Sequence, residues 1–277
     1  MKNTITILCL FLVQNFIGQN FQGKAVYKTS RKMNINIGGR NGTTMSDEQK
    51  AKLNARLMKQ FQKTFVLTFD KSSSMYKEEK NLKAPVARQG GNMVMVIGNG
   101  GGNDIVYKNV KENRFVNKTE IMGKLFLIKD ELPKYDWKLT GETKNIGVYT
   151  CYKATFTREE ERTNMSVEDG EVTEKKKKVD VVTTAWYTPS IPVSNGPGNY
   201  TGLPGLILEV KEGDLTILCS EIVMNPKDKI EIEEPRKGKK VSQSQYEKIM
   251  AKKSKEMMDK FKSRRKDGNN VEIRIGG

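Results

Sequence analysis

Acidic side chains are the residues of this chain best suited to acid–base chemistry. Glu159 to Glu161 form an uninterrupted run, and Asp136 is a further candidate. Paired carboxylates transfer protons in enzymes such as glycoside hydrolases, where the two groups take different roles. The same glutamates open a polar stretch, residues 159–174, with the composition of a solvated hairpin loop. A carboxylate-dependent hydrolase is therefore one hypothesis, and a solvated loop is the simpler interpretation.

Histidine is absent from all 277 residues. Its absence excludes the Ser-His-Asp and Cys-His nucleophile systems, the HExxH zinc site and acid–base catalysis by imidazole. Most common hydrolase designs are thereby excluded, and no catalytic residue can be assigned.

Methionine and glycine offer two weaker alternatives. Met93 with Met95 and Met257 with Met258 could bind Cu(I) through thioether sulfur, although methionine is also an ordinary core residue. The run GNGGGN at residues 98–103 lacks the third glycine and the following helix of a dinucleotide-binding loop. We expect no cofactor and no metal.

The first 19 residues have the pattern of a secretory signal peptide. A single positive charge at Lys2 precedes an apolar stretch from Ile5 to Val13, and small or polar residues follow around Gly18. The apolar stretch is too short to span a membrane. We therefore expect export to the periplasm, the outer membrane or the cell exterior, with no transmembrane segment in the mature chain.

Cys151 and Cys219 are the two cysteines that remain after the signal peptide is removed. An oxidising compartment permits a disulfide between them. Two separate buried thiols on different strands are equally compatible with the sequence, because a bridge needs Cα atoms within roughly 7 Å.

The chain is strongly basic, with 49 Lys and Arg against 33 Asp and Glu, a net charge of +16. In an exported protein, an anionic lipid surface, lipopolysaccharide or an acidic glycan is a better electrostatic partner than nucleic acid. A lysine-rich surface that is merely solvated is the alternative.

Most of the chain reads as short strands separated by turn residues. The region from Ile105 to Thr157 predicts successive antiparallel strands with short connections. A capping box at Ser46 and Gln49 predicts a helix through Lys63, and a basic amphipathic helix is expected to begin near Ser244, with Glu247 as its capping partner. These elements predict the α+β class, with a curved, mainly antiparallel sheet, one helix after the first strand and a basic C-terminal helix.

The chain divides by composition into three parts. Residues 1–19 are the signal peptide, residues 20–226 the antiparallel-sheet domain, and residues 227–277 a basic linker followed by an amphipathic helix. We expect that helix to pack on the sheet, and binding to an acidic membrane surface is the alternative.

The stretch NYTGLPGLILEV, residues 199–210, places glycine and proline inside an apolar run. Proline fixes φ and glycine tolerates positive φ, so Pro204 and Gly205 are expected at the centre of a type II turn. A strand from Leu206 to Val210 and a hairpin at residues 212–214 should follow. Every residue here has a backbone or packing reason to be present, so a structural corner is favoured over a direct binding site.

The region from Trp137 to Val210 resembles the GLPGLI family of exported Bacteroidetes proteins, which is named for the motif at Gly202 to Ile207. The resemblance rests on the motif and on the aromatic, proline and glycine residues before it. The residues that could form a binding site are Trp186, Tyr187, Pro189, Pro192, Gly196, Pro197, Gly202, Leu203, Pro204, Gly205, Leu206 and Ile207. The resemblance implies an uncharacterised function and a half-barrel-like sheet similar to lipoprotein carriers, and it supplies no catalytic residue.

We expect an exported, non-enzymatic envelope protein that binds or carries an apolar ligand or polypeptide segment. A structural partner of an outer-membrane receptor or export system is the alternative, and the carboxylate-dependent hydrolase is the third. A deep apolar pocket would favour a carrier, convergent carboxylates an enzyme, and a flat apolar patch an interaction protein.

Overall fold

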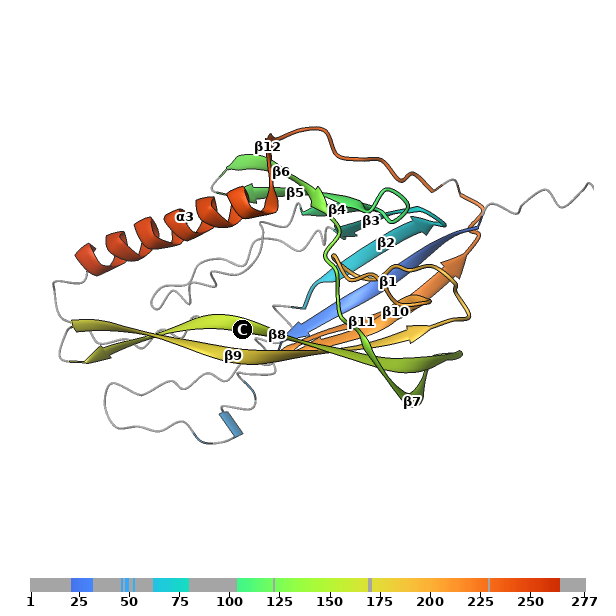
Figure 1. Cartoon of the computed structure of the whole chain (residues 1–277), viewed down its shortest axis with the longest axis horizontal. Coiled ribbons are helices and arrows are strands. Elements are labelled where there is room, and N and C mark those ends of the chain that lie inside the picture. Colours follow the sequence, from blue (N-terminus) through green and yellow to red (C-terminus); the bar gives the residue numbers. More distant parts are fainter. Residues whose placement is uncertain are drawn as a thin grey trace, which may run out of the picture.

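A computed structural model describes residues 21–31, 62–79, 104–121, 123–168, 171–228 and 230–264, together with Ser46, Glu48, Gln49 and Lys52. The described strands form a single twelve-stranded sheet in the order β12-β6-β5-β4-β3-β2-β1-β11-β10-β9-β8-β7 (Figure 1). The strands are β1 (Gln22–Arg31), β2 (Thr64–Asp70), β3 (Ser73–Glu78), β4 (Ile105–Asn109), β5 (Arg114–Ile121), β6 (Lys124–Glu131), β7 (Lys138–Ile146), β8 (Tyr149–Glu168), β9 (Glu171–Thr188), β10 (Leu206–Glu212), β11 (Leu215–Met224) and β12 (Lys239–Val241).

Neighbouring strands are antiparallel except for β12, which pairs with β6 in parallel. Strands that are far apart in the sequence pair at the centre of the sheet. There β1 pairs with β11, from Gly23 opposite Met224 to Arg31 opposite Leu215. The predicted antiparallel sheet is thus confirmed. The sheet is open, with β12 at one edge and β7 at the other.

The predicted α+β class is wrong, because the described chain is nearly all β. Within the described residues, one long helix is present, α3 (Gln243–Arg264). The helix expected after the first strand is described only at its start, where Ser46 and Gln49 form the predicted capping box. The remainder of that prediction falls outside the described residues. The likeness to a half-barrel carrier was part of the same prediction and is corrected with it.

The physical reason for this error is the extent of strand pairing. The acid-rich stretch at residues 159–174, expected to be a loop, continues β8 and β9 as a hairpin whose pairing runs to Glu168 opposite Glu171. Glutamates of β8 face lysines of β9, with Glu159 bound to Lys178 and Glu161 to Lys176. Such opposite-charge pairs support strand pairing in place of apolar contacts. Figure 1 shows this hairpin projecting beyond the rest of the sheet.

Helix α3 lies on the sheet over β6, next to the β12 edge. It begins with a capping box between Ser242 and Gln245, rather than at the predicted Ser244 and Glu247. Tyr246 and Ile249 pack against Phe126 and the surrounding buried residues. The expected packing of this helix on the sheet is therefore confirmed for its first turns. None of the described helices combines the length and apolar character needed to cross a membrane.

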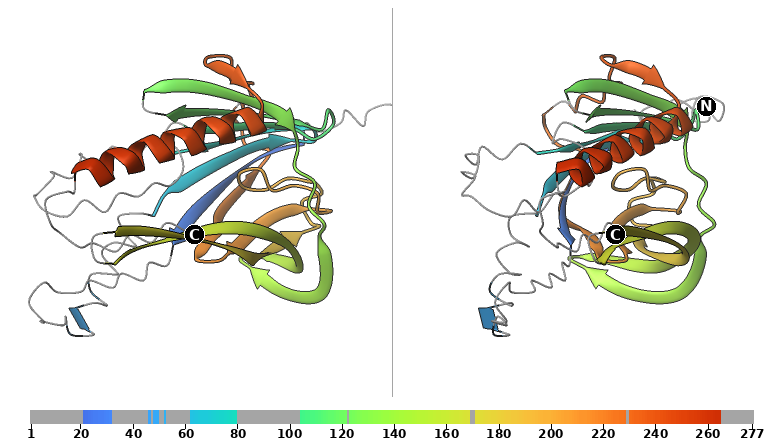
Figure 2. Two further views of the ribbon diagram at one scale, coloured as in Figure 1. Left: turned by 60° about the vertical axis from the view of Figure 1, so that its left-hand side comes forward. Right: turned by 90° about the vertical axis from the view of Figure 1, so that its left-hand side faces the viewer.

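The two faces of the sheet differ. We call the face that carries Tyr27, Leu67 and Val106 the inner face, because these residues belong to the main buried core. Residues 189–205, here called the crossing segment, lie against it, and Figure 2 shows the sheet curling around them. The opposite side is the outer face. Residues 230–238, here called the strap, cross the outer face, where Ile232 packs on a small buried cluster that includes Tyr107 and Val116.

Candidate functional site

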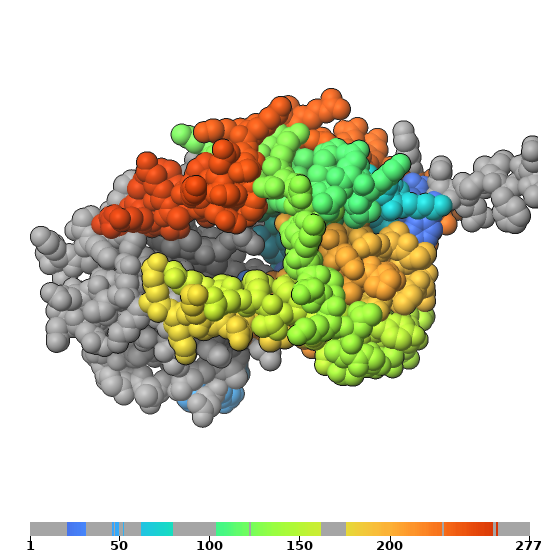
Figure 3. All heavy atoms as spheres, viewed as in Figure 1, coloured from blue at the N-terminus to red at the C-terminus, as the bar shows by residue number. Residues whose placement is uncertain are grey.

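The crossing segment is fixed to the inner face by hydrogen bonds that it accepts from β10 and from β3. Leu206 donates its N–H to the carbonyl of Ile191 at 3.0 Å, and Ile207 donates to that of Asn195 at 2.9 Å. The Asn195 side chain is buried and accepts a hydrogen bond from the Ser74 hydroxyl at 3.2 Å. In the space-filling view the segment fills the space between β4–β6 and β7–β9 (Figure 3).

The Gly202–Ile207 motif forms a corner, but not the predicted type II turn. Gly205 is absent from the described glycines with positive φ, whereas Gly202 has φ 92°. The Gly205 N–H donates to the carbonyl of Leu203 at 2.9 Å, which is the two-residue bond of a γ-turn centred on Pro204. Glycine is required at 205 because a Cβ there would overlap the carbonyl of Thr188.

The strand after the motif also differs from a regular alternation. The pairing of β10 with β9 shifts between Ile207 and Glu209, so Leu208 is an extra residue in the ladder. The whole stretch from Leu206 to Val210 is buried. A β-bulge of this kind bends the strand and allows successive side chains to be enclosed.

Most of the twelve predicted site residues are enclosed. Trp186 is half-buried, and seven others are buried: Tyr187, Gly196, Pro197, Leu203, Gly205, Leu206 and Ile207. The exposed ones are Pro189, Pro192, Gly202 and Pro204. Gly196 packs so closely that a Cβ would lie 2.8 Å from the Cβ of Ile207. The structure therefore brings these residues together as a packed corner that offers a ligand little side-chain surface.

Lys108 is a buried ionisable residue that the sequence analysis did not identify. It lies on β4, is fully buried, and donates its ammonium to the carbonyls of Gly196 at 2.7 Å and Tyr200 at 3.4 Å. Burial lowers the pKa of this amine to about 7. Lysine in an alternating strand normally indicates a solvent-facing position, so no local signal could have found it. Its hydrogen bonds hold the crossing segment against β4.

A second group of contacts fixes the crossing segment to β8 and β10. Arg158 donates two hydrogen bonds to Glu212, at 2.6 and 2.9 Å, and Tyr200 donates a third at 3.0 Å. The hydrogen bonds from Arg158, followed by others including that from Thr183, lower the pKa of Glu212 to about 2. Rings surround this pair, with centroids 4.8 to 5.6 Å apart among Tyr135, Trp137, Phe156 and Tyr200.

Trp137 adds a direct bond to the same segment. Its indole N–H donates to the carbonyl of Thr201 at 2.8 Å. Trp186 contacts a different cation. The ammonium of Lys144 lies 4.3 Å from its ring centroid and also donates to Glu209 at 2.5 Å. A cation held over an indole ring and against a carboxylate is already neutralised.

The two cysteines are free and buried. Burial raises the pKa of Cys151 to about 11 and that of Cys219 to about 12. Both thiols are therefore protonated at neutral pH, where a thiolate would be needed for nucleophilic attack.

The carboxylates proposed for acid–base work do not converge with one another. Glu159 pairs with Lys178 and Glu161 with Lys176, each at 2.8 Å across the β8–β9 hairpin. Asp136 is exposed. Within the described residues no group of three or more Cys, Asp or Glu side chains could hold a metal ion. Met93 and Met95 lie outside the described residues.

The outer face carries lysines on alternate strands. In an antiparallel ladder, residues opposite one another share a face. Val26 lies opposite Val66, Val66 opposite Lys77, and Ile105 opposite both Lys77 and Lys118. Lys24 and Lys28 lie two positions either side of Val26 and so share this face.

These outer-face lysines lack acidic partners. Lys24, Lys28 and Lys77 are exposed, Lys118 is half-buried, and none of the four makes an ion pair with a described residue. Lys129 differs, because it and Arg114 both bind Glu234 of the strap, at 2.6 and 2.8 Å. The result is a lysine-rich surface over β1–β5 beside a strap held by ion pairs, and the same face carries Glu221 opposite Val26 and Glu120 two positions from Lys118.

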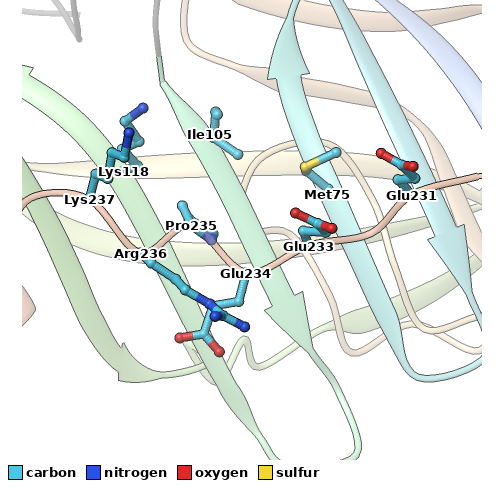
Figure 4. A pocket seen from close by; sticks show the side chains of 9 residues that line it. All are labelled: Met75, Ile105, Lys118, Glu231, Glu233, Glu234, Pro235, Arg236 and Lys237. Atoms are coloured by element: carbon cyan, nitrogen blue, oxygen red, sulfur yellow. The ribbon is translucent and has the colours of Figure 1, made fainter.

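An open groove of about 600 Å³ separates the strap from the strands beneath it. Its apolar lining comes from Met75, Ile105 and Pro235, and the charged lining from Lys118, Glu231, Glu233, Glu234, Arg236 and Lys237. Figure 4 shows Lys118 and Lys237 together at one end, and Glu231 and Glu233 toward Met75 at the other. Arg236 and Glu234 lie between these two ends (Figure 4), and Glu234 is held by Arg114 and Lys129.

Residues 137–209 match the model of a family described as a protein of unknown function (Porph_ging). The match begins at Trp137 and ends at Glu209, so it includes the crossing segment and the corner. The outer-face lysines of β1–β5 and the strap lie outside it. No curated protein matches the sequence.

Two solved structures of PNGF-II are similar in fold to a limited degree. The one in space group C2 has a TM-score of 0.48 and the one in P21 a TM-score of 0.49, each with 15% sequence identity. The similarity covers 84% of this chain and 33% of PNGF-II, so the chain spans about a third of the length of the protein it matches.

Proposed function

We propose that the protein is an exported, non-enzymatic envelope protein that binds an anionic lipid surface with the outer face of its sheet. The observation that carries this proposal is the group of exposed lysines on that face, Lys24 and Lys28 of β1 and Lys77 of β3, which share one side of the sheet and make no ion pair with a described residue. Lysines near a membrane surface each contribute about 1 kcal/mol to binding anionic lipids.

Export supports this choice of partner. The N-terminal pattern of residues 1–19 favours a secretory signal peptide, and phosphate-bearing lipids are among the anionic surfaces that an exported protein meets. Membership of the GLPGLI family, which the motif at Gly202 to Ile207 suggests, is part of the same proposal.

The remaining alternatives receive less support from the described residues. The apolar-ligand hypothesis needs a free inner face, and the crossing segment occupies much of that face through Lys108 and Asn195. The hydrolase hypothesis needs converging carboxylates, whereas Glu159 and Glu161 are paired with lysines across a hairpin.

Vesicle co-sedimentation tests the proposal. We expect the mature protein to bind vesicles of phosphatidylglycerol and phosphatidylcholine, with affinity that falls as salt rises, and not to bind pure phosphatidylcholine. Reversing three charges in K24E/K28E/K77E should weaken binding at least about 100-fold, since each lost lysine removes about 1 kcal/mol and each added glutamate repels the anionic surface.

The matched control is K71E/K111E/K134E. It changes the net charge by the same amount with three exposed lysines that lie in turns and connections. We expect its binding to fall far less than that of the face variant. Equal losses in the two variants would show that net charge alone drives binding, and would contradict the proposed face.

A further inference from the structure

We propose that the groove beneath the strap binds a phosphoethanolamine group, with the phosphate at Lys118 and Lys237 and the ammonium at Glu231 and Glu233. The groove has two lysines at one end and two glutamates toward the other, and Ile105 and Pro235 lie between them beside Arg236 and Glu234 (Figure 4). A ligand with the reverse arrangement of charges neutralises both ends at once.

The cationic end comes from two different elements. Lys118 projects from the outer face of β5, and Lys237 belongs to the strap just before Gly238. Gly238 lies close to β6, because a Cβ there would be 2.9 Å from the carbonyl carbon of Phe126. Neither lysine makes an ion pair with a described carboxylate. Two ammonium groups at one end of a groove repel one another, and a phosphate between them removes that repulsion.

The acidic end is equally unpaired. Glu231 and Glu233 flank Ile232, which anchors the strap to the buried cluster beneath it, and neither glutamate makes an ion pair with a described residue. Glu234 is different, because Arg114 and Lys129 already bind both of its oxygens. Glu234 therefore fixes the strap, while Glu231 and Glu233 remain available for a cation.

The spacing of the two ends selects the ligand class. Met75 is on β3 and Lys118 is on β5, two strands apart, which corresponds to about 10 Å between backbones. Ile105 on β4 lies between them. Because the positive and negative ends of the groove lie apart, a zwitterion whose phosphate and ammonium are joined by an alkyl link fits better than an α-amino acid, whose two charged groups are attached to one carbon. Met75, Ile105 and Pro235 supply apolar contact for that link.

This inference deepens the proposed function, because phosphatidylethanolamine presents such a group at a membrane surface. Its membrane source rests on the proposed function, whereas binding of the group itself does not. A soluble probe therefore separates the two.

The first experiment titrates the mature protein with sn-glycero-3-phosphoethanolamine, followed by NMR chemical shifts. Glycerol 3-phosphate, ethanolamine and glycine are the comparison ligands. We expect glycerophosphoethanolamine to bind at least tenfold more tightly than each of them. Binding no tighter than that of glycerol 3-phosphate would overturn the proposal.

Two variants assign the ends of the groove. In K118Q/K237Q, glycerophosphoethanolamine should no longer bind more tightly than ethanolamine. In E231Q/E233Q, it should no longer bind more tightly than glycerol 3-phosphate. All four side chains lie at a surface groove, so folding should be retained, which a circular-dichroism melt checks. An unchanged ligand preference in either variant would contradict the assigned geometry.

The second experiment identifies the source of the group. At a fixed fraction of phosphatidylglycerol, phosphatidylethanolamine replaces phosphatidylcholine in the vesicles, and we expect binding to strengthen severalfold, and to do so less in E231Q/E233Q. If the soluble probe binds and the vesicles show no gain, the groove takes a soluble phosphoethanolamine compound. Loss of all vesicle binding with the probe still bound would overturn the proposed function and leave the groove assignment intact.

Discussion

The two faces of the sheet use the same residue type in opposite ways. Lys77 on β3 is exposed on the outer face, whereas Lys108 on the neighbouring β4 is fully buried on the inner face. The buried ammonium has no carboxylate among its described partners and is held by the carbonyls of Gly196 and Tyr200. The orientation in the pleat and the presence of the crossing segment, rather than the residue itself, decide whether a lysine is a surface charge or an internal tie.

The difference extends beyond lysine. The inner face is closed by a proline- and glycine-rich segment that permits close backbone approach, and the outer face is crossed by a strap that leaves a groove. We infer that the inner face mainly provides stability and the outer face recognition. Three variants of the inner face test this division, each against a solvent-exposed counterpart.

The largest effect is expected at Gly205. Alanine there would place its Cβ against the carbonyl of Thr188, so the backbone must shift, and we expect a loss of about 3 kcal/mol in the free energy of unfolding. Gly213→Ala is the counterpart, since it lies in an exposed turn with φ 54° and open space around it; its cost should be about 1 kcal/mol. Urea denaturation measures both. Equal costs would remove the close-approach explanation.

The next effect concerns Lys108 and pH. The pKa of this amine is about 7 in the folded protein against 10.5 when unperturbed, so the unfolded state binds more protons between these values. Stability should therefore rise with pH, by about 2 kcal/mol between pH 7 and 8.5. The rise should persist in Lys77→Met and vanish in Lys108→Met. A wild-type protein whose stability is flat over this range would contradict the assignment, whether or not the Lys108 variant folds.

The smallest effect is expected at Glu212. Its pKa of about 2 lies below the ordinary 4.5, so its stabilising contribution is complete above pH 4.5 and is lost as pH falls toward 2. Solvent screening reduces this contribution to about 1 kcal/mol. Glu212→Gln should remove that part of the acid dependence, and Glu159→Gln, in the hairpin pair with Lys178, should leave it in place. Thermal melts from pH 2 to 6 distinguish the two variants.

Local patterns in the sequence predicted many of the strands. The hairpin of β2 and β3 and that of β10 and β11 follow from alternating apolar residues on either side of short turns. The region from Ile105 to Thr157 was expected to form successive strands, yet residues 132–137 within it are irregular and β7 begins at Lys138. Tyr135 and Trp137 pack instead into the ring group around Arg158 and Glu212, which is a tertiary choice that no local pattern reports.

The candidate sites were less predictable than the strands. The sequence indicated that Gly205 is required but gave the wrong reason, because a close approach to Thr188 depends on the fold and not on the dihedral preference of glycine. The basic character of the chain was evident, whereas its gathering on one face depends on the register of five strands. The groove needs residues from β3, β4, β5 and the strap, which are far apart in the chain.

The pairing of β1 with β11 has a consequence for folding kinetics. Gly23 and Met224 are partners, about 200 residues apart in the chain. Closing so long a loop costs conformational entropy before any contact repays it, and such high contact order places folding in the slow range of β proteins. During synthesis the first strand emerges long before its central partner. The centre of the sheet can therefore close only after β11 has left the ribosome, and the β12 edge can form only later still.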